Sequence, residues 1–249
     1  MIKKGLFGLC LTVALIHSGL AAAGELVSYK GENRELEGYF AKPKEKSKGL
    51  VVLIHDWDGI DQYEKKRVDM LAALGYSAFA LDLYGKGNRP VEQDKKKEET
   101  AKLYKDRKLM RALTLAGINE AQKREPLKTV LMGYCFGGAV SLEIARAQLG
   151  KDIVGFATFH GTLKTPEGQS YTQKPAPIFI AHGGADSGIP MTDVATLSGE
   201  LEKVGADYEI EVYSQAPHGF TVFDSSRYQE KADKKSWAGF TQFLEKVIR

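Results

Sequence analysis

The sequence predicts an α/β fold, in which a doubly wound, mostly parallel sheet carries helices on both faces and follows an amino-terminal β-hairpin. Short runs that are apolar at every position, such as residues 49–54 (GLVVLI), predict strands covered on both faces. Segments of helical length separate most of these runs, which is the order of βαβ units. The chain has 249 residues, and no linker or repeat divides residues 24–249, so we expect a single domain there.

The predicted elements follow from apolar patterning and from the residues that end them. In chain order, strands are expected at 25–29 and 35–41 (the hairpin, around Gly31-Glu32-Asn33), 49–54, 77–81, 129–132, 153–159, 177–181 and 208–213. Helices are expected at 62–74, 94–104, 107–124, 137–148, 191–204 and 229–247. Gly75 ends the first helix and Pro126 follows the third, while the lysine-rich second helix should present a solvated face.

The first 23 residues have the pattern of a secretory signal peptide. Lys3 and Lys4 precede an apolar run at 5–16, and small residues ending at Ala23 follow it. The run is shorter than the roughly 20 residues that span a bilayer, and a bulky residue precedes Cys10, unlike in a lipoprotein signal. We therefore expect cleavage after Ala23, a periplasmic or secreted protein, and no membrane attachment after cleavage.

Charge and cysteine content narrow the function. The formal net charge is +3, with interspersed lysines and glutamates and no basic stripe, so no nucleic-acid partner is expected. Without the leader, Cys135 is the only cysteine, although exported proteins usually pair their cysteines. A CxxC redox motif and a resolving thiol are both missing from the sequence after residue 23.

Cys135 stands in a G-x-C-x-G pattern, Gly133-Tyr134-Cys135-Phe136-Gly137, directly after a predicted strand. This pattern is typical of a nucleophile elbow, a strained strand-to-helix turn whose glycines allow close backbone approach. The turn would place the thiol at a helix amino terminus, where the dipole favours a thiolate. An incidental cysteine in a glycine-rich connection is the alternative.

Two later strand ends supply partners for Cys135. His182-Gly183-Gly184-Ala185-Asp186 follows the strand at 177–181, and Pro217-His218-Gly219 follows the strand at 208–213. Carboxyl ends of parallel strands meet at one edge of the sheet, and nucleophile, acid, base is the chain order of α/β-hydrolases. We predict a triad in which His218 takes the thiol proton or pairs with the thiolate and Asp186 orients the imidazole, with His182 packed beneath.

The loop His55-Asp56-Trp57-Asp58-Gly59 follows the strand at 49–54, where α/β-hydrolases place an oxyanion-hole amide. The backbone N–H groups of Trp57 and Phe136 are predicted to bind the developing oxyanion. His55, Asp56 and Asp58 are crowded on one turn and lack the spread of catalytic zinc ligands, so neither a metal nor another cofactor is predicted.

Together these motifs resemble the dienelactone hydrolase family, from about residue 38 to the carboxyl terminus. The motifs that carry the resemblance are LIHDWDG (53–59), ALDLYGKG (80–87), GYCFGG (133–138), FHG (159–161), HGGAD (182–186) and PHGF (217–220). The resemblance implies an α/β-hydrolase fold and a Cys-Asp-His triad. It also implies cleavage of a small ester or lactone through an acyl-thioester, by a monomer without cofactor.

A substrate pocket is also predicted. The resemblance points to Asp56, Lys86 and His160, and the aromatic residues Tyr84 and Phe220 near the predicted strand ends would suit a small apolar or aryl group. Dienelactone-specific members have a glutamate in place of Asp56, which helps to control the resting thiol, and commonly a tyrosine in place of His160.

Two further departures concern substrate charge. Dienelactone-specific members hold the substrate carboxylate with two arginines, where this chain has Lys86 and, four residues after His218, Val222. Lysine lacks the bidentate geometry of arginine, and valine has no charge, so we expect a preference for neutral esters or lactones. Lys86 and Arg89 are the side chains that could restore one anionic contact.

Three other functions are open on the same fold. The chain could be a non-catalytic binding protein, a lone-thiol redox or detoxification protein, or a peptidase. The complete triad argues against the first, and the lack of a lid domain or extended subsite loop argues against the third.

Overall fold

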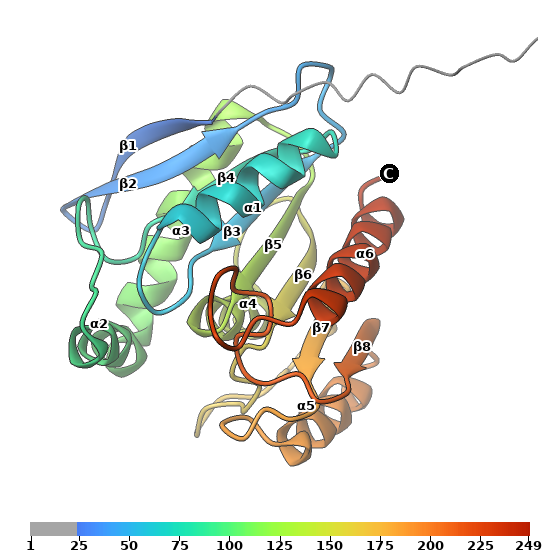
Figure 1. Ribbon diagram of the computed structural model, residues 1–249. Helices are drawn as coiled ribbons and strands as arrows, with labels where there is room; N and C mark the ends of the chain where they lie inside the picture. The colour runs from blue at the N-terminus through green and yellow to red at the C-terminus, as the bar shows by residue number, and fades with distance from the viewer. Residues whose placement is uncertain (1–23) are drawn as a thin grey trace, which may run out of the picture.

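The computed structural model describes residues 24–249, so the expected signal peptide lies outside the described residues. Strands β1 to β8 form one sheet in the order β1-β2-β4-β3-β5-β6-β7-β8 (Figure 1). The strands are β1 (Glu25–Gly31), β2 (Arg34–Ala41), β3 (Leu50–Ile54), β4 (Ser77–Leu81), β5 (Thr129–Tyr134), β6 (Ile153–Phe159), β7 (Ile178–Gly183) and β8 (Tyr208–Tyr213). The helices are α1 (Gln62–Ala73), α2 (Gln93–Lys105), α3 (Arg107–Arg124), α4 (Phe136–Arg146), α5 (Met191–Lys203) and α6 (Glu230–Val247).

The predicted hairpin and parallel sheet are both confirmed. β1 pairs with β2 and β2 with β4 in antiparallel register, whereas β4, β3, β5, β6, β7 and β8 pair in parallel. Glu32 and Asn33 turn the hairpin with positive φ angles of 50° and 59°, the backbone of a two-residue turn that matches strand twist. Every parallel strand therefore points its carboxyl end toward one edge of the sheet.

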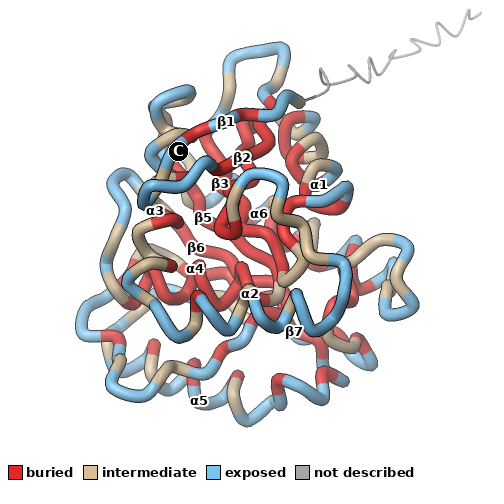
Figure 2. Tube along the Cα trace, turned by 90° about the vertical axis from the view of Figure 1, so that its left-hand side faces the viewer, coloured by how far each residue is buried: buried red, intermediate tan, exposed pale blue. Residues whose placement is uncertain are grey.

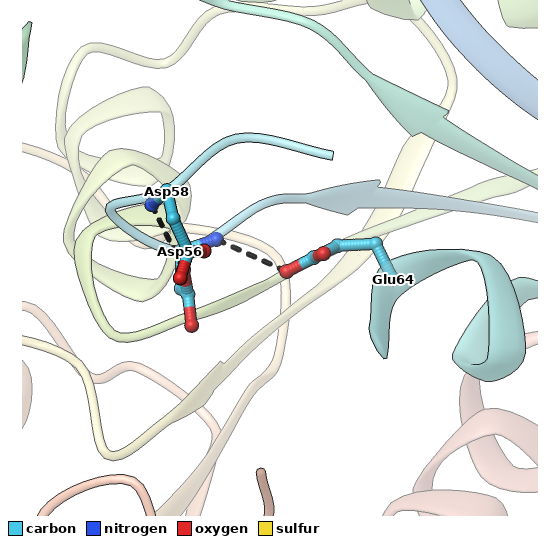
Figure 3. Close-up of side chains that lie close together, drawn as sticks. All are labelled: Asp56, Asp58 and Glu64. Carbon is cyan, nitrogen blue, oxygen red and sulfur yellow. Dashed lines mark hydrogen bonds between the residues drawn. The ribbon is translucent and has the colours of Figure 1, made fainter. Parts of the chain in front are cut away.

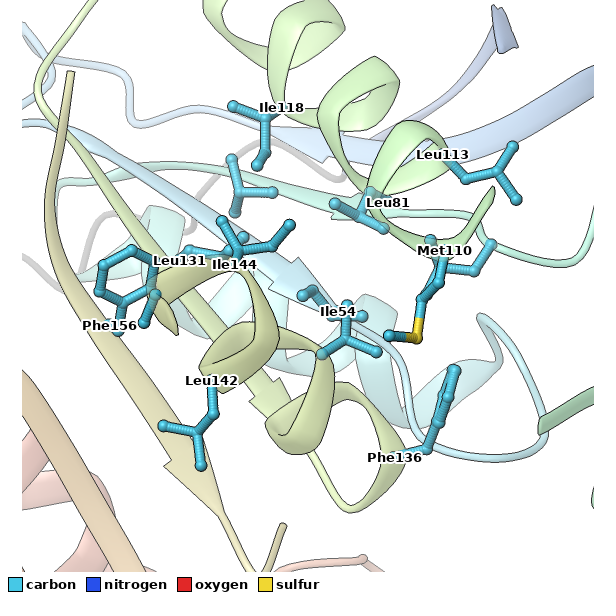
Figure 4. Close-up of a cluster of buried hydrophobic side chains, with 14 of the residues drawn as sticks. Ile54, Leu81, Met110, Leu113, Ile118, Leu131, Phe136, Leu142, Ile144 and Phe156 are labelled. Atoms are coloured by element: carbon cyan, nitrogen blue, oxygen red, sulfur yellow. The ribbon is translucent and has the colours of Figure 1, made fainter. Parts of the chain in front are cut away.

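Both faces of the sheet are buried, which explains the continuous apolar runs. In β3, Leu50, Val52 and Ile54 face one core cluster, whereas Val51 and Leu53 face the other. α1 and α6 pack on the second cluster, and α3, α4 and α5 on the first. Figure 2 shows β3 and β5 as buried strands between these helices. Figure 4 shows the first cluster, where Ile54 and Leu81 of the sheet meet Met110 of α3.

The predicted boundaries differ from the structure mainly at strand ends. β5 continues to Tyr134 and β7 to Gly183, two residues beyond the predicted ends, because glycines there still pair with the neighbouring strand. The extra residues carry both strands to the edge where the polar loops meet. Within residues 24–249, no helix is long and apolar enough to cross a membrane.

Candidate active site

Cys135 occupies a strained turn between β5 and α4. Its backbone has φ 50° and ψ −112°, a conformation that costs a non-glycine residue on the order of 1–3 kcal/mol. A Cβ on Gly137 would lie 2.3 Å from the carbonyl oxygen of Ile54, and one on Gly133 would lie 2.1 Å from the carbonyl carbon of Gly137. Only glycine fits at these two positions, so the pattern read as a nucleophile elbow has that geometry.

The structure brings the three predicted triad residues together. His218 Nε2 lies 3.0 Å from Cys135 Sγ, and His218 Nδ1 lies 2.8 Å from Asp186 Oδ2. The other carboxylate oxygen of Asp186 accepts the N–H groups of Gly188 and Ile189, each at 3.0 Å. Burial raises the pKa of Asp186, but the bonds from His218 and these amides outweigh burial and hold its pKa below the usual value. Asp186 is therefore an ionised acceptor for the Nδ1–H group of His218.

The Cys135 thiol is neutral in this geometry. Burial raises its pKa to about 12, against the opposing effects of the Phe136 N–H group and the Arg227 charge. The Phe136 amide at the helix terminus favours the thiolate, as expected, but burial outweighs this effect and the pKa rises overall. The thiol proton has to pass to His218 as attack begins.

Two cavities flank Cys135 and His218. The smaller, of about 100 Å³, is also lined by Asp56, Trp57, His160, Gly219, Val222 and Arg227. The larger, of about 310 Å³, is also lined by Trp57, Thr100, Tyr104, Phe136, Thr162, Gly188 and Ile189. Other hollows lie between the edge strand β8 and α6, away from the triad. The reacting sulfur thus faces two spaces of different size.

Three residues predicted for the substrate pocket do not line either cavity. Lys86 donates from Nζ to Ser28 Oγ on the hairpin at 3.0 Å. Tyr84 is buried and donates its hydroxyl to the Trp57 carbonyl at 3.1 Å, so it supports the loop from behind. Phe220 is fully buried against His160, with ring centroids 5.5 Å apart. These assignments are corrected, because adjacency to a motif does not fix the direction of a side chain.

Arg89 also stays away from the cavities, since its guanidinium donates to the carbonyls of Ile60, Asn88, Gly85 and Glu37. It lies 3.6 Å from Asp82. These bonds hold Arg89 beneath the loops. Neither Lys86 nor Arg89, the two cations considered from the sequence, therefore reaches either cavity.

Asp56 belongs to a carboxyl cluster with Asp58 and Glu64 (Figure 3). Asp56 accepts the Asp58 N–H at 3.1 Å, and Glu64 accepts the Asp56 N–H at 3.4 Å. Burial raises the pKa of Asp56 and of Glu64 well above their usual values. Burial also acts on Asp58, but its bonds to Asp56 and Lys96 lower its pKa overall, and Lys96 Nζ lies 3.0 Å away. Lys96 therefore neutralises part of the charge of this cluster.

His160 supports the triad from behind as a neutral ring. Its Nε2 lies 2.8 Å from Thr221 Oγ1, which is also 2.6 Å from the Tyr63 hydroxyl. The ring packs edge-on against His218 with centroids 5.3 Å apart. Burial lowers the pKa of His160 well below its usual value. His182 is also buried, and its pKa is lowered by burial, as expected for a residue packed beneath the site.

Sequence reasoning missed several cavity residues. Arg227 stands in no motif, on the loop before α6, and its guanidinium covers Gly219. Thr100 and Tyr104 lie four residues apart on α2, and both line the larger cavity. Because residues at this spacing share one face of a helix, the spacing could have indicated that they act together. Ile189 follows Asp186 on the acid loop.

Comparisons with known proteins show the family and the fold of this chain. The sequence profile described as "Dienelactone hydrolase family" matches residues 36–248. The chain is 27% identical to "Protein usf" of Aquifex pyrophilus, over 83% of this chain and 94% of that protein. It is 26% identical to a carboxymethylenebutenolidase of Pseudomonas putida, over 74% of this chain and 79% of that protein. A solved dienelactone hydrolase-like promiscuous phosphotriesterase from metagenomic libraries has a TM-score of 0.82 at 22% identity, covering 91% of this chain and 99% of that one. This likeness confirms the α/β-hydrolase fold.

Proposed function

Because the chain belongs to the dienelactone hydrolase family, it is a hydrolase of carboxylic esters or lactones, and we propose that Cys135, His218 and Asp186 perform the cleavage. The observation that carries the proposal is the unbroken contact from Sγ through the imidazole to the carboxylate, at 3.0 Å and 2.8 Å. Each contact is within the range expected for a nucleophile, its base and the group that orients the base.

In the proposed first half-reaction, Sγ attacks the substrate carbonyl carbon while its proton moves to His218 Nε2. Asp186 stabilises the resulting imidazolium through the Nδ1–H bond. The tetrahedral intermediate collapses when the C–O bond breaks and His218 protonates the leaving oxygen. The product of this half is an acyl-thioester on Cys135.

In the second half-reaction, His218 removes a proton from water, and the hydroxide attacks the thioester carbonyl. The C–S bond breaks, the carboxylic acid leaves, and Cys135 recovers its proton. The same base serves both halves, since it is neutral again once the first leaving group has been protonated.

We assign the oxyanion hole to the backbone N–H groups of Trp57 and Phe136. The Cys135 N–H already donates to the Phe159 carbonyl at 3.0 Å, so it is not free to bind the oxyanion. Phe136 is the first residue of α4, and Trp57 follows β3 at the same edge of the sheet. Helix-start amides and loop amides in this position suit a developing negative charge.

We further propose that neutral esters or lactones are preferred. Val222 lines the smaller cavity, and Lys86 lies outside it. Arg227 is the cation in that cavity wall, but it is exposed, and a solvent-screened contact is worth at most about 1 kcal/mol. We therefore expect Arg227 to favour an anionic substrate by less than about fivefold.

Stoichiometric alkylation tests the proposed function. Iodoacetamide should abolish ester hydrolysis in proportion to the modified fraction of Cys135, because no other thiol is present in residues 24–249. Full activity of completely alkylated protein would refute the proposed nucleophile.

The charge preference needs a separate comparison. The enzyme should hydrolyse the methyl ester of a dienelactone carboxylate better than the free carboxylate, measured as kcat/KM. Val222→Arg should raise kcat/KM for the free carboxylate by about 10- to 100-fold, the value of one charge-assisted bond. A preference of the unmodified enzyme for the free carboxylate would refute the neutral preference while leaving the triad unaffected.

A further inference from the structure

We propose that the larger cavity beside Cys135 is a subsite for an apolar or aryl group of the ester, with α2 forming one wall. The inference rests on the proposed function and names its substrate class: esters with one bulky apolar half and one compact half. It assigns a specificity role to Thr100 and Tyr104, which belong to no motif of the sequence.

The location of the cavity ties it to the reaction. Cys135 and His218 form part of its wall, so a group attached to the reacting carbonyl can enter it. Thr100 and Tyr104 contribute one side from α2, and Phe136 and Ile189 contribute others. The lining residues come from six separate segments of the chain, which converge at this edge of the sheet.

The apolar character of the wall excludes a charged ligand. Burial raises the pKa of the Tyr104 phenol to about 12, so this side chain is neutral. The single Thr100 hydroxyl hydrogen is directed at the carbonyls of Lys96 and Lys97, at 3.1 Å and 3.0 Å, so its donor is used within its own helix. Tyr104 and Phe136 meet edge to face, with ring centroids 5.3 Å apart. Aromatic rings arranged in this way favour an aryl ligand.

The wall is held in place before any substrate binds. Lys96 of α2 lies 3.0 Å from Asp58 and 5.4 Å from the centre of the Trp57 ring. Leu103, the buried residue of α2, packs into the core on the same helix. α2 is therefore fastened to the loop that carries the proposed oxyanion amide, and the subsite needs no rearrangement to form.

The smaller cavity determines which half of the ester binds in the larger one. It has about a third of the volume, about 100 Å³ against about 310 Å³, and includes Asp56, His160 and Arg227. A compact or polar group fits there, so the bulky apolar group has only the α2 side available.

Matched esters test the subsite. Benzyl acetate and methyl acetate differ in the alcohol, and methyl phenylacetate and methyl acetate differ in the acyl group. In at least one pair, the aryl member should have a kcat/KM higher by about 10-fold or more, the gain expected from burying an aryl group. Thr100→Trp, which fills the cavity, should reduce that ratio to within about threefold of unity. Ala101→Trp adds the same side chain at an exposed neighbouring position of α2 and should leave the ratio unchanged.

A measurement without ester turnover separates this inference from the proposed function. Cys135 should react faster with N-benzyl iodoacetamide than with iodoacetamide, again by about 10-fold, and Thr100→Trp should remove the difference. If no ester is hydrolysed but the alkylation difference persists, the proposed function fails and the subsite stands. Equal alkylation rates with N-benzyl iodoacetamide and iodoacetamide would overturn the subsite. A preference for the benzyl reagent that survives Thr100→Trp would also overturn it.

Discussion

The two sides of the active site are held by different means. On one side, Cys135 is fixed by buried backbone contacts, with Gly133 and Gly137 packed against neighbouring chain segments. On the other side, α2 is largely exposed and is attached through Leu103 and the Lys96–Asp58 pair. The reacting groups therefore depend on glycine positions that tolerate no other residue. The cavity wall formed by α2 depends instead on surface contacts, which can change without loss of the fold.

Replacing the base should give the largest effect and define the rigid side. His218→Ala removes the proton acceptor from Cys135, and kcat should fall by about 10³-fold or more. Asp186→Asn should cost less, because the base remains and only its orientation and charge stabilisation are weakened. Steady-state kinetics on one neutral ester would measure both. A fall of less than tenfold for His218→Ala would show that the thiol does not depend on this histidine.

Adding one methyl group to the elbow should lower the free energy of unfolding. Gly137→Ala places a Cβ 2.3 Å from the Ile54 carbonyl oxygen, and we expect a loss of about 1–3 kcal/mol in the free energy of unfolding. Gly199→Ala is the matched control, because Gly199 lies on the exposed side of α5 with open space around its Cβ position. That change should stabilise the protein by roughly 0.5–1 kcal/mol. Denaturant titration of both variants would distinguish them, and equal effects would remove the steric explanation.

The pH dependence of thiol reactivity should sharpen the account of Cys135. Its raised pKa, about 12, means that the thiolate fraction increases throughout the alkaline range. The rate of alkylation by iodoacetamide should therefore keep rising with pH through pH 10, rather than levelling off. A plateau below pH 7 would indicate a resting thiolate–imidazolium pair instead of a neutral thiol.

Charge variants at Arg227 and Lys86 should give the smallest effects. Arg227→Ala should change the kcat/KM ratio of a carboxylate substrate to its methyl ester by less than about fivefold, since the guanidinium is exposed. Lys86→Ala is its control and should leave that ratio unchanged, because Lys86 binds Ser28 outside the cavities. A larger effect from Lys86 than from Arg227 would contradict the observed placement of both.

The sequence predicted backbone positions better than the directions of side chains. β3 was predicted because burial on both faces restricts the residue types that fit there. The elbow at Cys135 was predicted because close backbone approach restricts its neighbours to glycine. Lys86, Tyr84 and Phe220 were misplaced in the pocket, since a motif fixes a backbone position but not the direction of a side chain. Arg227 and Tyr104 were missed because long-range packing alone brings their segments to the site.

Capture of the covalent intermediate tests the central claim most directly. The protein would be mixed with an activated aryl acetate, quenched in acid within one turnover, digested and analysed by mass spectrometry. The account predicts an acetyl group on the peptide that contains Cys135, formed in a burst that precedes steady-state release of acetate. Steady turnover of the ester with Cys135 unmodified at every time point would contradict it.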